Sequence, residues 1–238
     1  ALPEQVTRDV IRGAFDSAGQ RCSATRVLFL QDDIHDTMVE MLVGAAEALE
    51  VGDPIDYATD IGPVIDEQSQ DTLDAHKARM YRSARKLADV KLPEDCRAGT
   101  YVTPAIFEIG AISELEREVF GPILHVIRFR QGQLDRVCQA INETRFGLTL
   151  GLHSRIDAVA DFVAEHARVG NFYVNRNQIG AVVGVQPFGG EGLSGTGPKA
   201  GGPNYLARFA TERVRTTDIT ATGGNVQLLS LSNRTPKT

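Results

Sequence analysis

The sequence predicts an α/β fold, in which a largely parallel, twisted sheet is flanked by helices and followed by a C-terminal β-arm. Between residues 122 and 176, apolar segments of strand length alternate with segments whose apolar residues recur at helical spacing. The first of these strands, PILHVIRF at residues 122–129, reads as apolar on both faces, as parallel strands between two helical layers do. The 238 residues are enough for a sizeable core.

Five elements are expected before this region. The opening helix carries Val6, Val10 and Ala14 on one face and ends near Gly19. The elements expected next are a buried strand at residues 25–30, a helix at 34–49, a second helix at 67–88 and a strand at 101–109.

The second half of the chain continues the alternation. A helix with Val137, Cys138 and Ile141 on its apolar face follows the strand at 122–129. The elements expected next are a strand at residues 147–153, a helix at about 156–163, a strand at 170–176, a short helix at 205–210 and an exposed strand at 214–220 with a Gly-Gly turn after it. We place a boundary between an α/β domain, residues 1–210, and an arm with a tail, residues 211–238.

Composition and cysteine spacing argue against several classes of protein. A net charge of −6 without a cluster of Lys and Arg argues against a nucleic-acid surface, and no apolar run has the length of a membrane span. Three widely spaced cysteines give neither a disulfide framework nor a CxxC metal site, and the five histidines form no HExxH pair. We therefore expect no metal site and a reducing, cytoplasmic setting.

Cys22 is the first candidate for chemistry. It lies in FDSAGQRCSATRV, on the link between the opening helix and the first strand, where Gly19 leaves room and Arg21 supplies a cation. A nucleophilic cysteine needs such access and nearby positive charge. The residues alone also allow a small buried side chain with no chemical role. Cys96 is expected in a surface loop and Cys138 in the core.

Two further stretches have both a functional and a structural interpretation. GEGLSG, residues 190–195, matches the dinucleotide pattern GxGxxG, but the Pro-rich and Gly-rich residues that follow prevent the helix that this motif requires. The glycine-rich loop at residues 180–202 could instead hold an anion through its backbone N–H groups, or serve as a tether. Glu118 could accept hydrogen bonds from ligand hydroxyls, or belong to a solvated acidic turn.

Five segments, in this order, resemble the C-terminal half of the aldehyde dehydrogenase superfamily. They are GQRCSA around Cys22, EVFGPILHV at residues 118–126, FGLTLGLHS at 146–154, NFYVNR at 171–176 and QPFGGEGLSGTG at 186–197. The glycine-rich loop is most similar to that of the L-glutamate γ-semialdehyde (1-pyrroline-5-carboxylate) dehydrogenases, above all to the dehydrogenase module of the bifunctional proline utilisation A proteins. The TATGGNVQLL segment resembles the continuation of those proteins beyond the catalytic domain.

The resemblance implies a role for each matching residue. Cys22 would attack the aldehyde to form a thiohemiacetal and then a thioester. Glu118 would bind the ribose hydroxyls of NAD at its nicotinamide end, and Phe120 would pack beside that end. Residues 1–210 would form the catalytic domain of the dehydrogenase.

The same resemblance implies a substrate site. The N–H groups of Gly180 and Ala181, with the hydroxyl of Ser23, would anchor the carboxylate of L-glutamate γ-semialdehyde, and Phe188 would cover its aliphatic stem. Relatives often have serine where this chain has Ala181, so one side-chain donor is lost. The implied reaction is oxidation of the semialdehyde to L-glutamate in proline catabolism.

The resemblance also implies parts that lie outside this sequence. The family's N-terminal NAD-binding domain, its general-base glutamate and its oxyanion-hole asparagine precede GQRC, so we expect this fragment alone to have little or no activity. An arm from Thr211 would make a homo-oligomer. Three alternatives stay open: a dehydrogenase for another small aldehyde, a cysteine hydrolase or acyltransferase that pairs Cys22 with a histidine, and a non-catalytic assembly module that pairs through the strand at 214–219.

Overall fold

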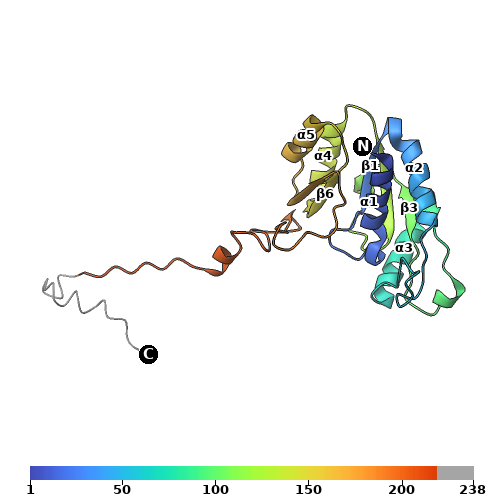
Figure 1. Ribbon diagram of the computed structural model, residues 1–238, viewed down its shortest axis with the longest axis horizontal. Coiled ribbons are helices and arrows are strands. Elements are labelled where there is room, and N and C mark those ends of the chain that lie inside the picture. Colours follow the sequence, from blue (N-terminus) through green and yellow to red (C-terminus); the bar gives the residue numbers. More distant parts are fainter. Residues whose placement is uncertain (219–238) are drawn as a thin grey trace.

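The computed structural model describes residues 1–218, and the helices and strands alternate along most of that length (Figure 1). The α-helices are α1 (Pro3–Phe15), α2 (Asp32–Glu47), α3 (Glu67–Ser83), α4 (Leu134–Glu143) and α5 (Asp157–His166). The strands are β1 (Val27–Gln31), β2 (Arg85–Asp89), β3 (Ala105–Glu108), β4 (Ile123–Phe129), β5 (Phe146–Gly147), β6 (Thr149–Leu152), β7 (Asn171–Val174) and β8 (Glu191–Gly192). Short 3-10 helices lie at Asp16–Gly19, Glu94–Cys96, Ile112–Glu114 and Leu206–Phe209.

The main sheet has the strand order β1-β4-β3-β2. β4 pairs in parallel with both β1 and β3, whereas β2 is an antiparallel edge strand beside β3. A second, parallel pair joins β6 to β7, and β5 pairs with β8 in antiparallel fashion. This arrangement confirms the predicted α/β fold with a largely parallel sheet.

Helices cover the main sheet on both faces. Neighbouring residues of a strand point to opposite faces, so each strand contacts both helical layers. Phe107 of β3 and His125 of β4 are paired in register and face α3, where Tyr81 meets the Phe107 ring at 5.5 Å and His76 bonds His125. Arg128, three residues after His125, lies on the other face and pairs with Asp36 of α2. β4 is buried at its first five positions, so it forms the centre of the core.

The structure corrects the expected end of the second long helix and the expected exposure of Cys96. The second long helix does not continue to residue 88, because α3 ends at Ser83 and Ala84 adopts extended dihedral angles of −126° and 162°. Residues 85–89 form β2 instead, since they complete the edge of the sheet beside β3. Cys96 is also not a surface residue: it is 5% exposed, and its thiol points toward the carbonyl oxygen of Val51 at 3.9 Å.

Residues 134–174 form a smaller layer, in which α4 and α5 pack together beside β6 and β7 (Figure 1). A cavity of about 480 Å³, lined by residues of both parts, lies between this layer and the layer of β1 and α1.

The C-terminal segment projects from the folded body (Figure 1). Residues 211–218 are not part of a strand, so the expected strand at 214–220 is not formed by its described portion, and residues 219–238 lie outside the described part of the chain. Within residues 1–218 no helix is long and apolar enough to cross a bilayer.

Candidate active site

The turn that carries Cys22 is built by an abrupt end of α1. Ser17, Ala18 and Gly19 follow one another with φ values of 57°, 52° and 64°, in the left-handed region. This conformation reverses the chain and leaves Cys22 exposed at its outer side. A Cβ on Gly19 would lie 2.2 Å from the carbonyl oxygen of Gly121, so only glycine allows the turn to touch the loop before β4. Two motifs that are 100 residues apart in the sequence therefore meet at this contact.

Arg26, the residue before β1, joins the Cys22 turn to the loop before β4 through its side chain. We call this arrangement the Arg26 clamp. Its guanidinium donates to the backbone carbonyl of Gly19 and, at 2.9 Å, to that of Arg21, on either side of the turn. It also donates twice to Oε1 of Glu118, at 3.1 and 3.2 Å, and lies 4.6 Å from the centre of the Phe120 ring. Burial lowers the pKa of Arg26, whereas the charges of Glu118 and Cys22 raise it. The clamp thus joins the cysteine turn to both residues predicted to bind a cofactor.

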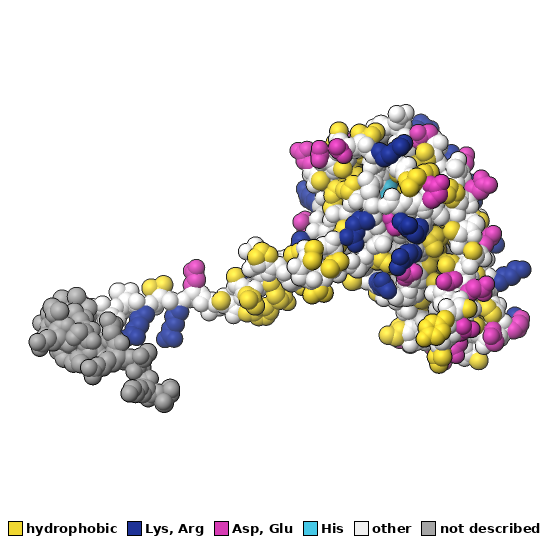
Figure 2. Space-filling model, in the orientation of Figure 1, with side chains coloured by type: hydrophobic (Ala, Val, Ile, Leu, Met, Phe, Trp, Pro, Cys, Tyr) yellow, Lys and Arg dark blue, Asp and Glu magenta, His cyan; other side chains and the backbone are white. Residues whose placement is uncertain are grey.

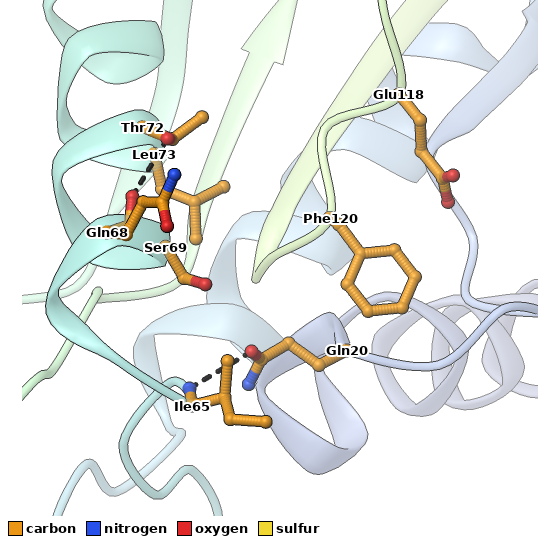
Figure 3. A pocket seen from close by; sticks show the side chains of 8 residues that line it. All are labelled: Gln20, Ile65, Gln68, Ser69, Thr72, Leu73, Glu118 and Phe120. Atoms are coloured by element: carbon orange, nitrogen blue, oxygen red, sulfur yellow. Dashed lines mark hydrogen bonds between the residues drawn. The ribbon is translucent and has the colours of Figure 1, made fainter.

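A cavity of about 410 Å³ opens beside the clamp (Figure 3). Residues of α3 and the turn before it form one wall, and Glu118 and Phe120 lie across from them with Gln20 between. The lining residues are Gln20, Ile65, Gln68, Ser69, Thr72, Leu73, Glu118 and Phe120. Cys22 is exposed and does not line this cavity, whereas Gln20 of the same turn does.

The polar groups of this cavity suit a ligand that has hydroxyls and a flat ring. Both bonds from Arg26 go to Oε1 of Glu118, and Oε2 receives no hydrogen bond from the described residues. A carboxylate oxygen in that position can accept from a sugar hydroxyl. Phe120 and Leu73 supply apolar surface for a ring.

The glycine-rich loop reaches the cysteine turn through Gln178, whose amide nitrogen donates to the carbonyl of Ser23 at 3.4 Å. Within residues 1–218 the N–H groups of Gly180 and Ala181 donate to no protein acceptor, whereas Val182 donates to Gln186 at 3.0 Å. Two adjacent amides are therefore available to an anion.

The other predicted substrate residues are placed less directly. Ser23 is 4% exposed, and none of the hydrogen bonds of residues 1–218 joins its hydroxyl to the loop. Phe188 is half-buried, in a backbone bridge whose two bonds to Ala200 measure 2.9 and 3.0 Å. The GEGLSG segment pairs with β5 and forms turns, so the dinucleotide interpretation of this motif is excluded.

None of the five histidines, all within the described residues, hydrogen-bonds to Cys22. His76 and His125 bond each other at 2.9 Å, and His153 pairs with Asp9 at 3.6 Å. His35 bonds Asp36, and His166 bonds a carbonyl of its own helix. A cysteine hydrolase therefore lacks its base here. In the described part of the chain no three His, Cys, Asp or Glu side chains gather as a metal site.

Comparison with known proteins identifies the family. The model of the aldehyde dehydrogenase family matches residues 2–214. The chain belongs to this family. It is 52% identical over 218 residues to the bifunctional protein PutA of Escherichia coli (strain K12), a match that covers 90% of this chain and 16% of that protein.

Two solved structures of aldehyde dehydrogenase relatives show the same fold. A mutant of Bradyrhizobium japonicum proline utilization A superposes with a TM-score of 0.85 at 59% identity, over 90% of this chain and 22% of that one. A 1-pyrroline-5-carboxylate dehydrogenase from Thermus, solved with bound NAD, superposes with a TM-score of 0.81 at 32% identity, over 88% and 40%. The chain thus spans about a sixth of the PutA sequence that it matches.

Several residues that assemble this candidate site were not predicted from the sequence. Arg26 stands four residues after Cys22 in the segment FDSAGQRCSATRV, and an arginine that close to a candidate cysteine was the available signal. No sequence motif marks Gln178 or the α3 residues of the cavity, because ordinary polar residues acquire a role only when the fold brings them to the site.

Proposed function

We propose that this chain carries the catalytic cysteine of an NAD-dependent dehydrogenase that oxidises L-glutamate γ-semialdehyde to L-glutamate in proline catabolism. The observation that carries the proposal is the Arg26 clamp, which holds the Cys22 turn against Glu118 and Phe120. The names of the relatives, PutA and 1-pyrroline-5-carboxylate dehydrogenase, support the substrate.

Cys22 is the nucleophile of the proposed reaction. Its thiol gives up its proton to solvent and the sulfur attacks the aldehyde carbon, so that a C–S bond forms and the carbonyl oxygen takes up the electron pair of the C=O bond. The backbone N–H of Cys22 contributes to stabilising that oxygen. Loss of hydride from the same carbon leaves a thioester on Cys22, which water cleaves to the carboxylic acid and the free thiol.

When NAD is bound, it would supply the acceptor for this hydride. The chemistry of the cavity fits its nicotinamide end, since the free Oε2 of Glu118 can accept from the ribose hydroxyls and Phe120 can pack beside the ring. Arg26 keeps Glu118 in place while it leaves that oxygen available.

The glycine-rich loop anchors the substrate. The free N–H groups of Gly180 and Ala181 bind its carboxylate together with the Ser23 hydroxyl, and Phe188 covers the aliphatic stem. Because Ser23 is 4% exposed, its hydroxyl reaches the carboxylate only if the loop or the ligand comes to it. The two backbone donors are therefore the main anchor.

The chain acts as part of a longer polypeptide. Residues 1–210 form the catalytic domain, and the general base and most of the NAD site come from sequence that the longer relatives contain. We propose that the segment that starts at Thr211 is the arm of a homo-oligomer; residues 219–238 lie outside the described part of the chain. Figure 2 shows apolar side chains along the C-terminal segment near the body. Leu206 and Phe209 are 80% and 76% exposed, as suits a surface that a second subunit covers.

Formation of NADH by the full-length gene product tests this proposal. The kcat/KM for the semialdehyde should exceed that for propanal by at least about 100-fold, because propanal lacks the carboxylate that the N–H groups of Gly180 and Ala181 would hold. The isolated 238-residue chain should produce no NADH. Equal kcat/KM values for the two aldehydes would refute the substrate assignment, and an inert full-length protein whose Cys22 is alkylated no faster than free cysteine would favour a non-catalytic assembly module.

A further inference from the structure

We propose that His76 and His125 form a positioning pair that sets the α3 wall of the cofactor cavity against the cysteine turn, an inference that rests on the proposed function. His76 lies on α3 and His125 on β4, and their Nε2 atoms are 2.9 Å apart with the rings at 84° to each other. His125 is fully buried. Neither residue lines the cavity.

The hydrogen bonds of the pair fix where each proton lies. The carbonyl of Arg26 can only accept, so Nδ1 of His125, 3.1 Å away, carries a proton and Nε2 of the same ring is the acceptor. Nε2 of His76 must then be the donor, which leaves Nδ1 of His76 to accept from Arg79 at 3.3 Å. Every ring nitrogen is satisfied when both rings are neutral.

The surroundings favour this neutral state. The charged groups that face the pair are all cationic: Arg79 and Arg117 beside His76, and Arg26 and Arg79 beside His125. Burial, with these charges, lowers the pKa of both imidazoles to about 4. Both rings are therefore neutral at neutral pH, and the chain of donors points in one direction, from Arg79 to the Arg26 carbonyl.

The pair joins the two sides of the candidate active site. The Arg26 carbonyl accepts from the backbone N–H of His125 at 3.0 Å as well as from its ring, and the side chain of the same Arg26 holds Gly19, Arg21 and Glu118. On the other side, His76 lies one helical turn after Thr72 of the cavity wall. The pair consequently determines how far the α3 wall stands from Glu118 and Phe120.

Substitutions in the full-length protein test this role through NAD affinity measured by calorimetry, which does not depend on turnover. His125→Leu should weaken NAD binding about tenfold, the effect of a lost buried hydrogen bond. His125→Asn should restore part of that loss, because its amide can still donate to the Arg26 carbonyl. The double variant H76L/H125L should bind NAD no more weakly than His125→Leu, since the two residues act as a unit.

Lys77→Met provides the matched control. Lys77 follows His76 on α3 and is also buried, but it bonds Asp89 at 2.9 Å and Thr103 at 2.8 Å, away from the cavity. This variant should lower the melting temperature and leave the NAD dissociation constant within about twofold of wild type.

The outcomes separate the two proposals. Wild-type protein that binds no NAD would refute the proposed function. Wild-type protein that binds NAD, with an unchanged affinity in His125→Leu or an equal loss in Lys77→Met, would overturn the positioning role alone. A raised KM for NAD with kcat within about threefold of wild type would support it.

Discussion

At the scale of single residues, Arg26 is the group on which the site depends most. It makes hydrogen bonds to Gly19, Arg21 and Glu118 and packs over Phe120, and it is 15% exposed at its side chain. Lysine cannot reproduce this fork of donors.

Arg26→Lys in the full-length protein should therefore lower kcat/KM by at least about 100-fold, because both Glu118 and the cysteine turn lose their support. Steady-state NADH formation measures it. Arg12→Lys, on the exposed side of α1 with a pair to Asp16 at 3.5 Å, is the control and should retain wild-type activity. Activity of Arg26→Lys within a few-fold of wild type would contradict the clamp.

The pair of His76 and His125 makes the free energy of unfolding depend on pH. The pKa of His76 and of His125 is about 4 in the folded chain and the ordinary value is 6.5, so the unfolded chain binds more protons between these limits. The free energy of unfolding should thus fall as the pH is lowered from about 6.5 to about 4. The melting temperature of H76L/H125L should fall less steeply over this window than that of wild type, and parallel curves would contradict neutral burial of the pair.

At the scale of elements, the end of α1 decides where Cys22 stands. Gly19→Ala should lower the free energy of unfolding by at least about 3 kcal/mol, because the left-handed backbone disfavours a side chain and the Cβ would collide with Gly121. Gly132→Ala is the control: its φ of 80° is also left-handed, but nothing lies within 4 Å of the added atom. It should cost about 1–2 kcal/mol. Denaturant unfolding of both variants measures the difference, and equal losses would show that the contact with Gly121 is unimportant.

The elements also show how far the sequence could predict the fold. Helical periodicity was sufficient to predict α1 and α4, and an apolar run on both faces was sufficient to predict β4. β2 was missed because Ala84 and Leu87 continue the helical spacing of α3, while its strand conformation depends on pairing with β3, which lies 16 residues further on. Such pairing is a property of the sheet and leaves no local pattern.

At the scale of the whole molecule, the fold brings together segments that the sequence keeps apart. The motifs around Cys22 and Glu118 predicted the candidate residues, and the resemblance to a family implied their roles. Their contact, through Gly19, Gly121 and Arg26, follows only from the parallel pairing of β1 with β4, which places the starts of both strands at one edge of the sheet.

The central claim is that Cys22 is the nucleophile, and a trapped intermediate tests it most directly. Full-length protein is mixed with L-glutamate γ-semialdehyde and NAD, quenched in acid within the first turnover and mapped by peptide mass spectrometry. The account predicts a thioester on the peptide that contains Cys22, none on the peptides of Cys96 or Cys138, and a loss of turnover of at least about 1,000-fold in Cys22→Ala with NAD binding retained. Formation of NADH by Cys22→Ala at a comparable rate, with the acyl group on another residue, would contradict it.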